Sequence, residues 1–136
     1  MNLDLRLSTT ALRRVLALDA LSGLAIGVLH LTAGDVLARW LGLPFTVITV
    51  MGWAIFLFVA LSGWLARQPV PARGPLMLLI VGNLVWAAEC LWLAFGSTHP
   101  VTPLGQAYLV VQAVAVLGLA DLEFLGWRGT GLRTAV

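Results

Sequence analysis

Four long apolar stretches constrain the fold of this chain more than any other feature. A helix that crosses a bilayer needs about 20 mostly apolar residues, because each residue rises about 1.5 Å through about 30 Å of hydrocarbon. Four stretches have this length, at about 12–31, 45–65, 76–95 and 104–125. Transmembrane strands would alternate apolar and polar residues over about 10 positions, which these stretches do not. We therefore predict an all-α fold: an integral membrane four-helix antiparallel bundle forming a single domain over residues 1–136.

The low content of charged residues supports this prediction. Only 10% of the 136 residues are charged, whereas the water-facing surface of a soluble domain brings that share to about a quarter. All eight basic residues are arginines, and none belongs to a basic cluster typical of nucleic-acid binding. Membrane lipid is therefore the expected environment, and no nucleic acid is expected as a partner. The single cysteine, Cys90, excludes an intramolecular disulfide.

The distribution of arginine predicts the orientation in the membrane. Seven arginines would share one side of a four-span protein: Arg6, Arg13, Arg14, Arg67, Arg73, Arg128 and Arg133. Only Arg39 would lie on the other side. Because basic residues stay in the cytoplasm, we expect a multi-pass protein with both termini cytoplasmic. Arginine without lysine points to a GC-rich bacterial genome, and hence to a bacterial inner (plasma) membrane.

Two acidic residues lie where a charge is costly. A charged side chain at mid-bilayer costs at least about 2.5–3.5 kcal/mol. Asp19 falls in the cytoplasmic third of the first span, where Asn83 or a neighbouring arginine could satisfy it. Glu89 falls just outside the midplane with no basic residue at its depth, and its expected partner is Gln112. Asp19 and Glu89 are therefore the candidate proton or ligand site.

The other embedded polar residues are predicted to join helices. Asn83, Gln112 and Gln106 are expected to form hydrogen bonds between helices, each worth about 0.6–2 kcal/mol. Asp121 and Glu123 fall near the cytoplasmic boundary, where Arg13, Arg14 or Arg128 could pair with them.

Helical spacing adds two observations. At about 100° per residue, Gln112, Leu119 and Glu123 share a face of the fourth span, and Asp121 points roughly the other way. Gly23 and Gly27 form a GxxxG pattern, which lets two helices approach closely. We expect these two glycines to lie at a helix–helix contact.

No residue pattern indicates a reaction or a cofactor. His30 and His99 both fall on the outer side, but a third ligand with suitable spacing is missing from the sequence, so we expect no metal and no cofactor. The sequence also has no GxSxG, HExxH or glycine-rich phosphate loop. We therefore do not expect an enzyme.

Five short runs of residues can be compared with a known family: Leu12 to Ala20, Leu41-Gly42-Leu43-Pro44, Asn83-Leu84-Val85-Trp86, Thr102 to Gln112-Ala113, and Ala120 to Arg128. These runs resemble a family of small bacterial four-span integral membrane proteins of unknown function. The resemblance implies this topology and no activity. It also implies that five residues belong to the family's pattern: Asp19, Asn83, Trp86, Gln112 and Asp121. Glu89 stands where a small residue such as serine would be expected.

Three hypotheses for function follow. The first is a non-enzymatic bundle that packs with a second copy of itself or with another membrane protein, suggested by Gly23 and Gly27. The second is a small proton-coupled transporter, analogous to small multidrug exporters, that uses Asp19 or Glu89. The third is a haem-binding membrane protein that uses His30 and His99.

Overall fold

A computed structural model describes residues 7–131 of the chain, which contain five helices and no strand. The helices are α1 (Thr9–Thr32), α2 (Gly34–Leu41), α3 (Phe45–Arg67), α4 (Arg73–Phe95) and α5 (Pro103–Thr130). All but α2 are long and apolar enough to cross a membrane. These four helices contain the four predicted stretches, so the all-α fold class is confirmed. The largest difference is at α5, which continues to Thr130.

The ends of the long helices follow from local chemistry. The hydroxyl of Ser8 accepts a hydrogen bond from the backbone N–H of Ala11 (3.1 Å) and caps α1. The hydroxyl of Thr102 accepts from the backbone N–H of Gly105 (3.0 Å) at the start of α5. Pro103 is the first residue of α5, a position where the missing N–H of proline costs nothing.

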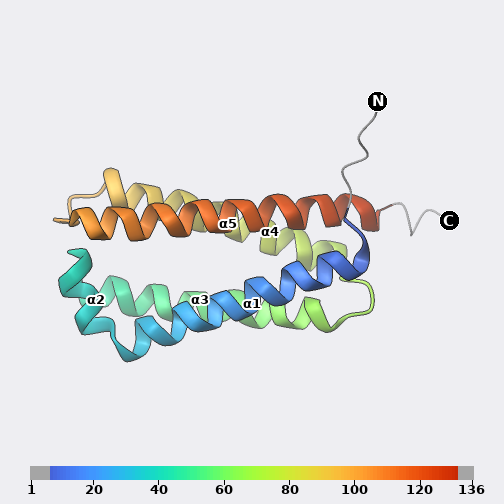
Figure 1. The fold of residues 1–136 in the computed structure, drawn as a ribbon, viewed down its shortest axis with the longest axis horizontal. Helices are drawn as coiled ribbons and strands as arrows, with labels where there is room; N and C mark the ends of the chain where they lie inside the picture. Colours follow the sequence, from blue (N-terminus) through green and yellow to red (C-terminus); the bar gives the residue numbers. More distant parts are fainter. Residues whose placement is uncertain (1–6, 132–136) are drawn as a thin grey trace.

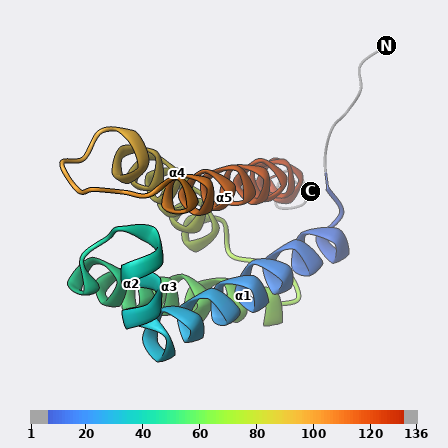
Figure 2. The same ribbon diagram turned by 60° about the vertical axis from the view of Figure 1, so that its left-hand side comes forward.

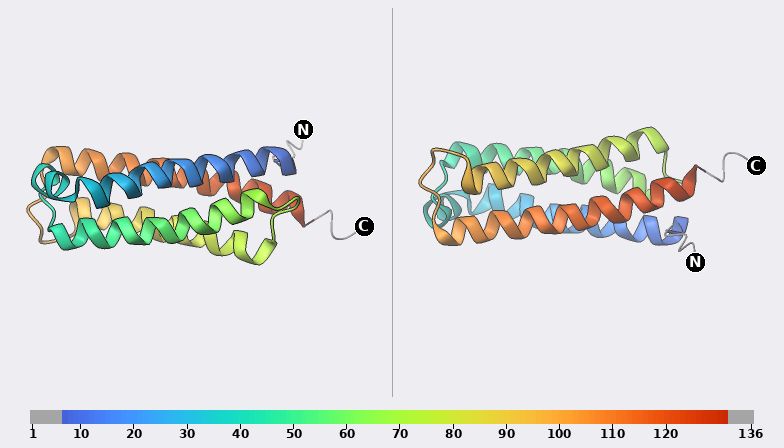
Figure 3. Two further views of the ribbon diagram at one scale, coloured as in Figure 1. Left: turned by 90° about the horizontal axis from the view of Figure 1, so that it is seen from below. Right: turned by 90° about the horizontal axis from the view of Figure 1, so that it is seen from above.

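The four long helices run side by side in alternating directions (Figure 1). They form two pairs: α1 packs mainly against α3, and α4 mainly against α5 (Figure 2). Within the described residues, the backbones of α1 and α4 do not approach each other closely, and neither do those of α3 and α5. The two pairs are therefore joined more loosely than the helices within each pair, and each view of Figure 3 looks onto one pair with the other behind it.

The described arginines gather at the two ends of the structure as the sequence predicts. The start of α1, the end of α3, the start of α4 and the end of α5 lie at one end (Figure 1). That end carries Arg13, Arg14, Arg67, Arg73 and Arg128, while Arg39 lies on α2 at the opposite end. Arg6 and Arg133 lie outside the described residues.

In each helix pair, an arginine of one helix donates a hydrogen bond to the C-terminal part of the other helix. Arg13 of α1 donates from Nε to the backbone oxygen of Ala66 at the end of α3 (2.9 Å). Arg73 of α4 donates from Nη1 to the backbone oxygen of Trp127 (2.7 Å) and lies 4.0 Å from the centre of its ring. The last carbonyls of a helix lack partners within the helix, so each arginine satisfies part of the terminus of its own pair.

Gly23 and Gly27 lie on the face of α1 that packs against α3. A Cβ atom at Gly23 would lie 2.9 Å from Val59, and one at Gly27 would lie 3.2 Å from Phe56. The close approach that these glycines allow is therefore used between two helices of the same chain.

The short helix α2 was not predicted, because it lies between the first two predicted spans, 12–31 and 45–65. Its Leu37 and Leu41 are buried in the core at this end of the structure. It ends at Gly42, whose φ of 71° favours glycine. A Cβ atom there would also collide with the backbone oxygen of Pro100, so this turn packs directly on the segment that leads into α5.

Candidate functional site

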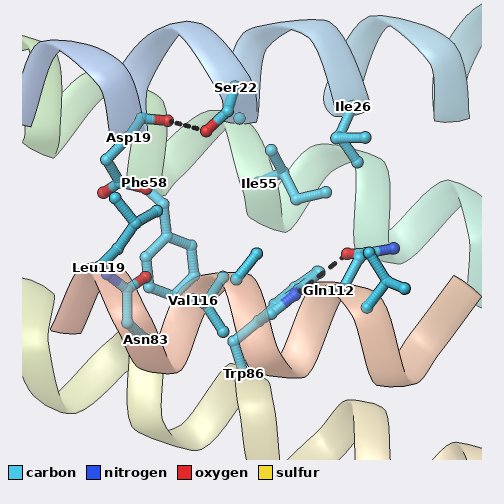
Figure 4. Close-up of a pocket in the computed structure, with 13 residues that line it drawn as sticks. Asp19, Ser22, Ile26, Ile55, Phe58, Asn83, Trp86, Gln112, Val116 and Leu119 are labelled. Atoms are coloured by element: carbon cyan, nitrogen blue, oxygen red, sulfur yellow. Dashed lines mark hydrogen bonds between the residues drawn. The ribbon is translucent and has the colours of Figure 1, made fainter. Parts of the chain in front are cut away.

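A cavity of about 250 Å³ lies between the two helix pairs. All four long helices contribute side chains to its wall (Figure 4). It reaches from Asp19 to Ile26 along α1 and from Val111 to Leu119 along α5. Asp19 and Ile26 are seven positions apart, which is roughly 10 Å of helix at 1.5 Å per residue, so the cavity is long enough for a small organic molecule.

The cavity opens between α1 and α5. Its wall on α3 and α4 is closed, because Ile55 and Trp86 are buried. On α1 and α5, by contrast, Ser22 and Ala115 are exposed, and Val111 is 67% exposed. We call this gap the α1/α5 window.

Beyond each end of the window, α1 and α5 are in contact. Toward the arginine-rich end, Leu12 packs so closely on Gly126 that a Cβ atom there would meet its side chain. Toward the α2 end, Nε2 of His30 lies 2.7 Å from the hydroxyl of Tyr108. Leu12 and His30 are separated by roughly 27 Å along α1 at 1.5 Å per residue. The window is therefore bounded above and below by packed side chains.

Two buried carboxyl groups and one amide meet beside the cavity. Asp19 is 8% exposed, Asn83 is 3% exposed and Glu123 is fully buried. Nδ2 of Asn83 donates a hydrogen bond to Oε2 of Glu123 (3.1 Å), and the carboxyl group of Asp19 neighbours both residues. Oδ2 of Asp19 and Oε1 of Glu123 have no hydrogen-bond partner. Of these two acids, only Asp19 lines the cavity (Figure 4).

A second polar group lies further along the cavity, toward the α2 end. Oε1 of Gln112 accepts a hydrogen bond from Nε1 of Trp86 (3.4 Å), while its Nε2 is buried without a partner (Figure 4). Between Gln112 and Asp19 the wall is apolar, with Ile55, Phe58 and Val116 among the residues that form it. The cavity thus offers an acceptor near one end, a donor near the other and an apolar middle.

The remaining polar residues singled out in the sequence lie elsewhere. Glu89 is exposed on α4, so the expected hydrogen bond to Gln112 is replaced by the one from Trp86. Asp121 is exposed on α5, and within residues 7–131 neither it nor Glu123 forms an ion pair with an arginine. Gln106 donates from Nε2 to the backbone oxygen of Ala94 (3.1 Å), which joins α5 to α4.

The two histidines do not come together at a ligand site. His30 is 1% exposed, and its ring nitrogens lie 3.2 Å from the backbone oxygen of Ile48 and 2.7 Å from Tyr108. His99 lies in the loop between α4 and α5. In the part of the chain that the structure describes, no group of three His, Cys, Asp or Glu residues could hold a metal ion.

Sequence reasoning missed that Glu123 is the acidic neighbour of Asp19. The helical spacing contained the signal, because it placed Glu123 on one face with Gln112 and Leu119 and turned Asp121 away. The proximity of Glu123 to the predicted membrane boundary favoured an arginine partner instead. In the structure α5 continues to Thr130, so Glu123 lies about two turns before the end of the helix. There its neighbour is Asp19 and not an arginine.

No family model matches the chain, and no curated protein or solved structure matches it either.

Proposed function

We propose that the protein binds a small amphiphilic molecule within the bilayer, as a small membrane transporter does. The observation that carries this proposal is the cavity itself, whose wall is mostly apolar, with Asp19, Ser22 and Asn83 near one end and Gln112 near the other. Ligand pockets in proteins are mostly apolar with a few polar groups that fix orientation. A ligand that donates a hydrogen bond to Asp19 and accepts one from Gln112 would satisfy two buried atoms that now lack partners.

The position of the window supports access from the lipid. In a membrane-spanning four-helix antiparallel bundle, the gap between α1 and α5 faces the acyl chains. A molecule dissolved in the bilayer would reach Asp19 without crossing the packed ends of the helices. Four of the five residues that the family resemblance implies also line this cavity: Asp19, Asn83, Trp86 and Gln112.

The proposed setting is a bacterial inner membrane with both termini in the cytoplasm. The five described arginines at the end where α1 begins and α5 ends support this orientation. Asp19 would then lie in the cytoplasmic half of the bilayer, and Gln112 nearer the outer half.

Blocking the window tests the proposal. Ala115 lines the cavity and is exposed, so Ala115→Trp would fill the window without disturbing the core. The probe is 1-adamantanol, a compact alcohol with an apolar body, added to protein in lipid nanodiscs and measured by calorimetry. We expect the wild-type protein to bind it and Ala115→Trp to bind it roughly tenfold more weakly or not at all.

Ala107→Trp is the matched control, because Ala107 is also exposed on α5 but does not line the cavity. It is expected to bind the alcohol as the wild type does. Equal binding by the wild type and Ala115→Trp would contradict the proposal, and so would a wild-type protein that binds no 1-adamantanol.

Packing with another membrane protein is a second candidate function. The glycines that first suggested it are used between α1 and α3. Glu89, however, is exposed on α4 among apolar residues such as Val85 and Trp92. A carboxyl group facing lipid is costly, and a partner that covers α4 would remove that cost.

A further inference from the structure

We propose that the ligand is a small organic cation, bound at Asp19 in exchange for one proton from the Asp19–Glu123 carboxyl pair. This inference rests on the proposed function and names the chemical class of the ligand. Two buried oxygens, Oδ2 of Asp19 and Oε1 of Glu123, lack a hydrogen-bond partner. They belong to neighbouring carboxyl groups. Two ionised carboxylates offer no donor to each other, whereas a protonated carboxyl group does.

The described residues that contact the pair carry no positive charge. Asn83 on α4 donates to Glu123, and α3 brings Ile55 and Phe58 to the cavity. Within residues 7–131, no arginine bonds to either acid. Two negative charges side by side in an apolar interior repel each other and lose their hydration. Even one unpaired negative charge loses its hydration in such an interior, so in the proposed exchange the site without a cation is neutral, with a proton on each carboxyl group.

A cation changes this balance at Asp19, the member of the pair that lines the cavity. When an ammonium group approaches, the Asp19 carboxyl releases its proton to the medium and its carboxylate pairs with the cation. Glu123 keeps its proton and can donate a hydrogen bond to the new carboxylate. The site is neutral before and after, so one proton leaves for each monovalent cation bound. The apolar wall then encloses the body of the ligand, and the indole of Trp86 offers a further surface attractive to cations.

The test compares two probes of nearly equal shape, 1-aminoadamantane as the cation and 1-adamantanol as the neutral molecule. Binding to protein in nanodiscs is measured by calorimetry in two buffers of different ionisation enthalpy, which counts protons released. We expect the wild-type protein to release about one proton for each amine bound and none for the alcohol. Asp19→Asn should bind the amine roughly tenfold more weakly or worse and release no proton.

Glu89→Gln removes an embedded carboxyl group outside the cavity and should behave as the wild type with both probes. Far-UV circular dichroism and SDS unfolding of Asp19→Asn check that this variant is folded. Amine binding by the wild type without proton release would overturn the proposed exchange. Unchanged amine binding by Asp19→Asn would overturn it too. Neither result would contradict the proposed binding function. A wild-type protein that binds neither probe would overturn both proposals.

Discussion

Asn83 occupies a position where one side chain supports two buried acids. It lies on α4, its amide nitrogen donates to Glu123 on α5, and its neighbour across the cavity is Asp19 on α1. Its hydrogen bond joins the two helices of one pair, and Asp19 belongs to the other pair. A buried amide of this kind orients the carboxyl groups as well as joining the helices.

Replacing Asn83 by leucine should therefore destabilise the protein. Asn83→Leu keeps an apolar body of similar size but leaves Oε2 of Glu123 without its donor. The expected loss is about 1–3 kcal/mol in the free energy of unfolding, the cost of an unsatisfied buried polar group. The measurement is unfolding in mixed micelles with increasing SDS.

Gln106→Leu provides the comparison for this variant. Gln106 donates to the backbone oxygen of Ala94, and its side chain is only partly buried. Its loss should cost about 0.6 kcal/mol, the average for such bonds in a membrane protein. Equal stability of Asn83→Leu and the wild type would show that Asn83 does not support Glu123.

At the scale of single elements, α5 is closely packed at its start and less so further along. At its start, Gly105 lies against the backbone oxygen of Leu41 at the end of α2. Thr102 fixes the same junction, since its backbone N–H donates to Leu41 (3.0 Å) and its hydroxyl to the backbone oxygen of Trp40 (2.6 Å). Gly118, further along α5, has open space where a Cβ atom would lie.

These two glycines should respond in opposite ways to alanine. Gly105→Ala would place a methyl group against backbone atoms that cannot turn aside, and should lower the free energy of unfolding by about 1–3 kcal/mol. Gly118→Ala adds a methyl group in open space and should leave stability unchanged or raise it by up to about 1 kcal/mol. SDS unfolding of the two variants in parallel gives the comparison. A neutral Gly105→Ala would mean that the α2–α5 junction is not closely packed.

The contrast between α5 and α2 also shows what the sequence could predict. The four long helices followed from the length of their apolar stretches, because a bilayer imposes that length. The short helix α2 did not, because Gly34 and Asp35 are typical of a break and only tertiary packing buries Leu37 and Leu41.

The candidate site was predictable in part. Asp19, Asn83 and Gln112 were identifiable as polar residues in apolar helices. Their position around one cavity depends on which helices are neighbours, and short loops leave that arrangement open. The exposed position of Glu89 on α4 depends on the same packing.

For the whole molecule, the proposed orientation in the membrane leads to a direct prediction. Single cysteines at Val70 and Thr98 would lie in the loops at opposite ends of α4. The natural Cys90 is fully buried and should not react. With a membrane-impermeant maleimide, we expect Thr98→Cys to be labelled in intact cells and Val70→Cys only after permeabilisation. The opposite pattern would place the arginine-rich end outside.

Arg13 and Arg73, which join the helices of each pair, indicate the order in which the two pairs can form during synthesis. Arg13 donates to a carbonyl of α3 and Arg73 donates to a carbonyl of α5, so each of these contacts lies within one helix pair. The chain leaves the ribosome in the order α1, α2, α3 and then α4, α5. The α1–α3 pair can therefore pack before the α4–α5 pair is synthesised. The cavity needs side chains of all four long helices, so it can form only after the second pair has been made.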